Sequence, residues 1–162
     1  MKNVLILCTG NSARSILGEA LVNHLGGGRL RGFSAGSQPK EQPHRLALEI
    51  LAAHGLPAEG YRSKSWKESA AAGAPKLAPT IPVCESPAGE ACRVWPGTPA
   101  AGHWGLPDPA AATGSEAERR AAFETAYRQL AQRISRLAAL DLDAMTGAEI
   151  KTALADIHRS SD

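Results

Sequence analysis

The first apolar run of the chain, VLIL at residues 4–7, is short, unbroken and partly β-branched. Such a run predicts a strand that is buried on both faces. The run ends at Cys8, and apolar positions recur at helical spacing from Arg14 to Leu25, before three glycines at 26–28 that end a helix. The pattern therefore predicts a strand, a short loop and a helix, with Cys8 and Arg14 at opposite ends of the loop.

Strands alternate with helices along the rest of the chain. Three patterns of Ser or Thr followed three residues later by Glu begin at Ser65, Ser115 and Thr146, and they predict helix N-termini with capping boxes. Pro82 lacks a backbone N–H and argues against a central position for its strand. The expected elements are strands at 30–35, within 80–84 and at 102–106, and helices at 44–54, from 65, at 115–137 and from 146.

Alternating strands and helices predict an α/β fold with a parallel sheet flanked by helices. The 162 residues fit one domain, residues 1–162, in which the chain from about 141 onward forms a C-terminal helical extension. Ligands of such sheets bind beyond the carboxyl ends of the strands, and Cys8 lies at one of these ends.

Composition excludes several classes of protein. The hydrophobic fraction is 43%, which supplies a core, and the net charge of +2 without any basic block argues against a nucleic-acid partner. No apolar run is long enough to span a membrane, and no signal peptide is recognised. Three cysteines are too few for a disulfide framework, so we expect reduced thiols in the cytoplasm. The histidines show no metal-binding spacing.

The loop after the first strand has the residues of an oxyanion site. Gly10 and Asn11 tolerate the backbone conformations in which successive N–H groups converge, and a helix N-terminus adds positive potential. Arg14 supplies a planar fork of donors that grips two oxygens of one anion. The same surroundings favour the thiolate form of Cys8. Ser12 and Ser15 are candidate donors to the sulfur, and Ser15 is preferred because it adjoins Arg14.

At these residues the sequence resembles a known family. VLILCTGNSARS is similar to the active-site loop of the low-molecular-weight protein tyrosine phosphatase fold, in its arsenate reductase branch. The likeness continues through FSAGS (33–37), ALEILAAHGL (47–56), RSKSW (62–66), VCESPAGEACRVWPG (83–97) and HWGLPDPAA (103–111), and so covers nearly the whole chain. It implies a four-stranded parallel sheet, in agreement with the strand count.

The resemblance implies a role for each matched position. Cys8 would be the nucleophile that attacks arsenate, and Asp108 the general acid that protonates the departing oxygen. Asn11 would keep the shape of the loop through its side chain. Without the resemblance, Asp108 is an ordinary turn aspartate before a proline. The residues that would hold the oxyanion are Thr9, Gly10, Asn11, Ser12, Ala13, Arg14 and Ser15.

Two further thiols distinguish a reductase from a phosphatase. The resemblance makes Cys84 the thiol that attacks Cys8 and Cys92 a candidate for the next disulfide exchange. A bridge between Cys84 and Cys92 requires their α-carbons to lie within about 7 Å of each other. No tightly bound cofactor is expected. Reducing equivalents would come from thioredoxin, from glutaredoxin with glutathione, or from mycothiol, and thioredoxin or glutaredoxin would be a transient partner of a monomer.

Two alternatives remain open from the sequence. The first is a low-molecular-weight protein tyrosine phosphatase that hydrolyses phosphate monoesters through a cysteinyl phosphate. Phosphatases of this fold carry aromatic residues around a tyrosine-sized pocket, whereas Asp108 and Pro109 are followed here by two alanines and Cys8 by a threonine. The second alternative is a binding module without catalysis, whose thiols sense arsenic or redox state.

The resemblance also marks residues that support the loop. Some relatives hold a potassium ion beside it, and Glu19 and Ser34 match two of the ligand positions. Lys64 stands in the region of the third, so we expect its ammonium group to replace the cation by pairing with Glu19. No metal is therefore expected in this site.

Overall fold

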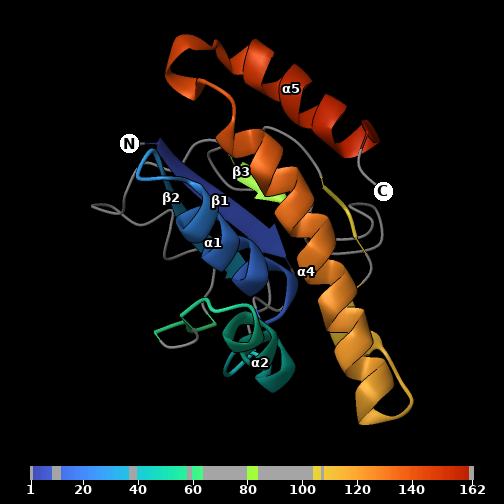
Figure 1. The fold of residues 1–162 in the computed structure, drawn as a ribbon. Helices are drawn as coiled ribbons and strands as arrows, with labels where there is room; N and C mark the ends of the chain where they lie inside the picture. Colours follow the sequence, from blue (N-terminus) through green and yellow to red (C-terminus); the bar gives the residue numbers. More distant parts are fainter. Residues whose placement is uncertain are drawn as a thin grey trace.

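The computed structural model of the chain describes residues 2–8, 12–36, 40–57, 60–63, 80–83, 104–106 and 108–160. Within them a parallel sheet packs against helices, as the alternating pattern predicted (Figure 1). The elements are β1 (Lys2–Cys8), α1 (Arg14–Leu25), β2 (Leu30–Gly36), α2 (Arg45–Ala53), β3 (Thr80–Pro82), the 3-10 helix η1 (Pro109–Ala111), α4 (Glu116–Ala138), the 3-10 helix η2 (Leu142–Ala144) and α5 (Gly147–Ser160).

The sheet of the described residues has the strand order β2-β1-β3, and both pairs are parallel. β1 is central, and its register with β2 runs from Lys2 opposite Leu30 to Cys8 opposite Gly36. Within this described sheet the short β3 is not central, in agreement with the prediction from its proline. The segment 104–106, expected as part of a fourth strand, lies beside β3 but donates a single backbone hydrogen bond, so in the described residues it is not a strand.

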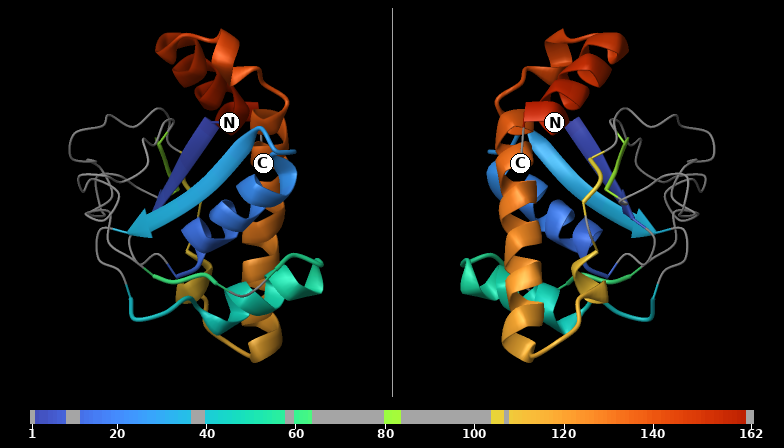
Figure 2. Two further views of the ribbon diagram at one scale, coloured as in Figure 1. Left: turned by 90° about the vertical axis from the view of Figure 1, so that its left-hand side faces the viewer. Right: turned by 90° about the vertical axis from the view of Figure 1, so that its right-hand side faces the viewer.

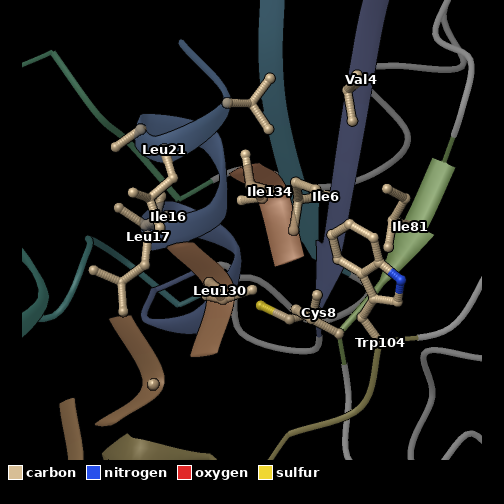
Figure 3. Packing of buried hydrophobic residues seen from close by; sticks show 14 of the residues in the cluster. Val4, Ile6, Cys8, Ile16, Leu17, Leu21, Ile81, Trp104, Leu130 and Ile134 are labelled. Carbon is tan, nitrogen blue, oxygen red and sulfur yellow. The ribbon is translucent and has the colours of Figure 1, made fainter. Parts of the chain in front are cut away.

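One face of the sheet is covered by α1 and α4, which Figure 2 shows side by side against the strands. Residues 4–7 of β1 are at most 1% exposed, which confirms the prediction of a strand buried on both faces. The helical stripes predicted for α1 and α4 are buried against it. Figure 3 labels five of their buried apolar members, Ile16, Leu17, Leu21, Leu130 and Ile134, and Phe123 and Leu137 are buried as well.

Two glycines allow α1 to approach the strands closely. A Cβ atom on Gly32 of β2 would lie 2.6 Å from the carbonyl oxygen of Glu19 in α1, and one on Gly18 would lie 2.9 Å from the side chain of Ile6. Any larger side chain at Gly32 would push the helix away from β2. This close packing fixes the start of α1 relative to the end of β1.

The predicted caps form where the structure describes them. The backbone N–H of Glu118 donates to Ser115 Oγ (3.2 Å) at the start of α4. At the start of α5, the N–H of Glu149 donates to Thr146 Oγ1 (3.1 Å), and the N–H of Thr146 donates back to the Glu149 carboxylate (2.9 Å). This hydrogen bonding lowers the pKa of Glu149. The helix expected from Ser65 lies outside the described residues.

The two ends of the sheet carry different helices. α5 crosses the C-terminal end of α4, at the end of the molecule where β1 begins, whereas α2 lies toward the carboxyl ends of the strands (Figures 1 and 2). No helix in the described part of the chain is both long and apolar enough to cross a bilayer.

Candidate active site

Cys8 is the last residue of β1, and its side chain is 3% exposed. Its sulfur points away from the strand toward the helix layer (Figure 3). Sγ lies 2.8 Å from Oγ of Ser15, which is fully buried in the first turn of α1. A thiolate accepts hydrogen bonds and does not donate, so the hydroxyl is the donor whenever the sulfur is ionised. The sequence preference for Ser15 over Ser12 as the partner is confirmed by this contact.

Arg14 begins α1, as predicted, and its side chain is only 4% exposed. Nη1 donates to the carbonyl oxygens of Leu106 (3.1 Å) and Val83 (3.4 Å). These two acceptors come from segments 92 and 69 residues away in the sequence, so sequence reasoning did not find them. The guanidinium is therefore held in a fixed direction by backbone from the β3 side of the sheet.

Asp108 faces the same guanidinium. Its Oδ2 lies 3.8 Å from Nη2 of Arg14, and its Oδ1 accepts a hydrogen bond from the backbone N–H of Ala110 (3.0 Å) at the start of η1. The side chain is 39% exposed, so the carboxyl group contacts both solvent and Arg14.

The start of α1 is anchored to α2 through His44. The backbone N–H of His44 donates to the carbonyl of Ser12 (2.8 Å), and its ring Nδ1 accepts the N–H of Leu46 as the N-cap of α2 (3.1 Å). The ring also packs against Phe123, with centroids 4.7 Å apart. Histidine is not among the preferred N-cap residues, and the sequence therefore gave no signal for this contact.

The electrostatic surroundings of His44 favour its neutral form. Burial lowers the pKa of His44, and the positive charges of Arg119, Lys40 and Arg45 lower it further, whereas the carboxylate of Asp108 opposes them. A neutral ring keeps Nδ1 available as an acceptor for the start of α2.

Glu19 and Ser34 form the described part of the predicted support. The buried Ser34 hydroxyl donates to Oε1 of Glu19, which joins α1 to β2 behind the loop. Burial raises the pKa of Tyr61, and the charge of Glu19 adds to the effect. No group of three or more metal-ligating side chains gathers among the described residues.

A hollow of about 470 Å³ lies beside Asp108. Among the described residues, neither Cys8 nor Arg14 lines this hollow, which therefore adjoins the site around the sulfur without containing it. Asp108 and Pro109 border it, and the other described side chains along it are small or polar: Ala111, Ala112, Ala122, Thr125, Ala126 and Gln129.

The structure thus brings together four of the predicted site residues: Cys8, Arg14, Ser15 and Asp108. Ser12 and Ala13, which immediately precede α1, are also buried. The remaining predicted positions lie outside the described residues: Thr9, Gly10, Asn11, Lys64, Cys84 and Cys92.

Comparison with known proteins shows which of them share this fold. Solved structures with the same fold include an arsenate reductase from Archaeoglobus fulgidus, with a TM-score of 0.66 and 24% sequence identity over 85% of this chain and 99% of that one. The tyrosine phosphatase Wzb from Escherichia coli K30, in complex with sulphate, has a TM-score of 0.64 and 24% identity over 85% and 96% of the two chains.

A thioredoxin-dependent arsenate reductase from Corynebacterium glutamicum shares the fold at a TM-score of 0.53 and 24% identity, over 83% of this chain and 62% of that one. No curated protein sequence matches the chain. The family model described as low molecular weight phosphotyrosine protein phosphatase matches residues 3–144. The chain belongs to this family.

Proposed function

We propose that the protein is an arsenate reductase that uses Cys8 as its nucleophile and passes electrons to arsenic through a relay of cysteines. The observation that carries the proposal is the meeting of the Cys8 sulfur, the Ser15 hydroxyl, the Arg14 guanidinium and the Asp108 carboxyl at the carboxyl end of β1. The activity takes place in a reducing cytoplasm, where the relay can be reset.

In the first step, the thiolate of Cys8 attacks the arsenic atom of arsenate. A sulfur–arsenic bond forms and an arsenic–oxygen bond breaks, and the departing oxygen leaves as water with a proton from Asp108. Arg14 and the N-terminus of α1 bind the remaining oxygens. Backbone N–H groups of residues 9–15 complete this binding site.

In the second step, the thiolate of Cys84 attacks the sulfur of Cys8. A Cys8–Cys84 disulfide forms, the sulfur–arsenic bond breaks, and its electron pair stays on arsenic, which leaves as arsenite. Cys92 then exchanges with Cys84, which frees Cys8 and leaves a Cys84–Cys92 disulfide. Two external thiols reduce that disulfide by successive exchange, supplied by thioredoxin, by glutaredoxin with glutathione, or by mycothiol, and no tightly bound cofactor is needed.

Two features favour arsenate over a phosphotyrosine substrate. Hydrolysis of a cysteinyl phosphate needs only water, whereas this chain carries two further thiols, Cys84 and Cys92. The described side chains around the hollow beside Asp108 include no aromatic ring that stacks on a tyrosine. The family also contains phosphatases, and the likeness to Wzb keeps hydrolysis of phosphate monoesters as the second candidate function.

The test compares two activities in wild type, Cys84→Ser and Cys92→Ser. Arsenite release is measured with thioredoxin, glutaredoxin with glutathione, and mycothiol supplied separately, and hydrolysis of p-nitrophenyl phosphate is measured without reductant. We expect Cys84→Ser to lose arsenite release and keep slow hydrolysis. Fast hydrolysis that does not depend on Cys84, with no arsenite from wild type under any reductant, would instead establish the phosphatase.

A further inference from the structure

Arg133 on α4 is a second buried arginine that the mechanism does not use. Its side chain is 4% exposed, and burial lowers the pKa of its guanidinium. Nη1 donates to the carbonyl oxygen of Trp104 (3.2 Å), whereas the buried Nε has no hydrogen-bond partner. Among the described residues no carboxylate pairs with it. A buried cation with so little compensation destabilises a fold, so its presence calls for a reason.

The segment 104–106 is tied to two helices at Trp104. The carbonyl of Trp104 receives Arg133 from α4, and its fully buried indole donates Nε1–H to the carbonyl of Leu154 in α5 (2.9 Å). Figure 3 shows the indole beside Ile81 of β3. The family match ends at residue 144, before α5 begins, so the tether to Leu154 is an addition to the matched region.

The other end of the same segment holds Arg14. Leu106 donates its N–H to Val83 (3.3 Å), and its carbonyl accepts from Nη1 of Arg14 (3.1 Å). In an extended chain, Trp104 and Leu106 are about 7 Å apart, which is too short for slack between the two contacts. Two buried arginines therefore donate to carbonyls of one three-residue segment, Arg133 at its start and Arg14 at its end.

We propose that Arg133 is a positioning residue for oxyanion binding: by holding the Trp104 carbonyl, it fixes the Leu106 carbonyl and thereby the direction of Arg14. The Trp104 indole, bound to α5, holds the same segment from the other helix. This inference rests on the proposed oxyanion role of Arg14 and applies to arsenate and phosphate alike, so it does not depend on the cysteine relay.

The experiment measures how inorganic phosphate protects Cys8 from alkylation by iodoacetamide, with the Cys8 peptide quantified by mass spectrometry. Arg133→Met keeps the length of the side chain and removes its donors. Arg128→Met is the matched control, because Arg128 lies on the same helix but is 75% exposed. The phosphate dissociation constant should rise about 5- to 10-fold in Arg133→Met, as expected for one hydrogen bond. It should be unchanged in Arg128→Met and partly restored in Arg133→Lys.

Two readouts separate positioning from a purely structural role. Positioning predicts that phosphate binds more weakly to folded Arg133→Met, whereas a purely structural role predicts a lower unfolding temperature with phosphate affinity unchanged. Unchanged phosphate affinity in folded Arg133→Met, even with a lower unfolding temperature, would overturn the proposal. If Arg133→Met does not fold, Trp104→Phe is tested instead, because it removes the indole donor to the carbonyl of Leu154. Weaker phosphate binding in Trp104→Phe supports the proposal, and unchanged binding refutes it.

Two measurements on the wild-type protein, phosphate protection of Cys8 and arsenite formation, distinguish this inference from the proposed function. If phosphate does not protect wild-type Cys8, the oxyanion role of Arg14 fails and this proposal fails with it. If phosphate protects Cys8 but no arsenite forms, only the reductase is refuted.

Discussion

The Sγ atom of Cys8 and the Oγ atom of Ser15 lie 2.8 Å apart across the corner between β1 and α1, and both side chains are buried. β1 is the central strand and α1 packs closely on the sheet at Gly18 and Gly32, so these two elements hold the two side chains in place relative to each other. A donor held this way stabilises a sulfur anion without reorganising when the anion forms. The contact is the one that the proposed nucleophilic role of Cys8 would use.

Replacing Ser15 by alanine should make Cys8 less reactive. A hydrogen bond to a charged group contributes about 1.5–3 kcal/mol, so Ser15→Ala should slow alkylation of Cys8 at neutral pH by roughly tenfold or more. The rate is measured on the Cys8 peptide after treatment with iodoacetamide. Ser115→Ala, which removes a hydroxyl at the N-cap of α4, serves as control and should leave the rate unchanged. An unchanged rate in Ser15→Ala contradicts the assigned donor.

Replacing Asp108 by asparagine should remove the proton donor and keep the turn. The side-chain oxygen still accepts the N–H of Ala110, so η1 should stay in place. Loss of a general acid lowers turnover by about 100-fold or more, and more for a poor leaving group than for a good one. Hydrolysis of phenyl phosphate should therefore fall further than that of p-nitrophenyl phosphate. Equal losses for the two esters would argue against the acid role.

The control for this substitution is Asp141→Asn. Asp141 is an exposed aspartate at the N-cap position of η2 that makes no side-chain capping hydrogen bond. Hydrolysis of phenyl phosphate and of p-nitrophenyl phosphate should both be unchanged in Asp141→Asn, because η2 follows the C-terminal end of α4 and lies away from the site.

His44 should make the fold less stable in mild acid. Burial lowers the pKa of His44 in the folded state, so below its usual value of about 6.5 the unfolded chain binds a proton more readily than the folded one. Its contribution is complete above about pH 6.5 and is lost as the pH falls through the lower folded value. Protonation would also remove the Nδ1 acceptor for Leu46.

His44→Asn tests this dependence, because asparagine is a good N-cap that does not titrate. Urea unfolding at about pH 7.5 and about pH 5.5 compares the two proteins, and the other four histidines are common to both. The free energy of unfolding of wild type should fall more between these two values than that of the variant. Equal falls would show that His44 carries no such dependence.

The features that the sequence predicted are local ones. A continuous apolar run, helical spacing and capping boxes depend on residues within a few positions of one another, and the structure confirms the strand at β1, the helices α1, α2 and α4, and the caps at Ser115 and Thr146. The Cys8–Ser15 contact could also be predicted, because a strand followed by a short loop and a helix leaves few positions for the first turn of the helix.

The features that the sequence missed depend on tertiary packing. Val83 and Leu106 hold Arg14 through backbone carbonyls, which every residue has, and no residue type marks them as ligands. His44 and Arg133 look ordinary in the sequence because their roles come from elements that lie far away along the chain. Of the fourth strand expected at 102–106, the structure describes residues 104–106, which make one backbone hydrogen bond, from Leu106 to Val83.

The central claim is that Cys8 attacks the oxyanion and that a second thiol then removes it as arsenite. A single turnover tests both parts at once: fully reduced protein is mixed with one equivalent of arsenate and no external reductant, and arsenite and remaining thiols are counted. We predict that wild type releases one arsenite for each pair of thiols lost, and that Cys84→Ser and Cys8→Ser release none. Arsenite from Cys84→Ser at the wild-type yield, or thiol loss in wild type without arsenite, would contradict the account.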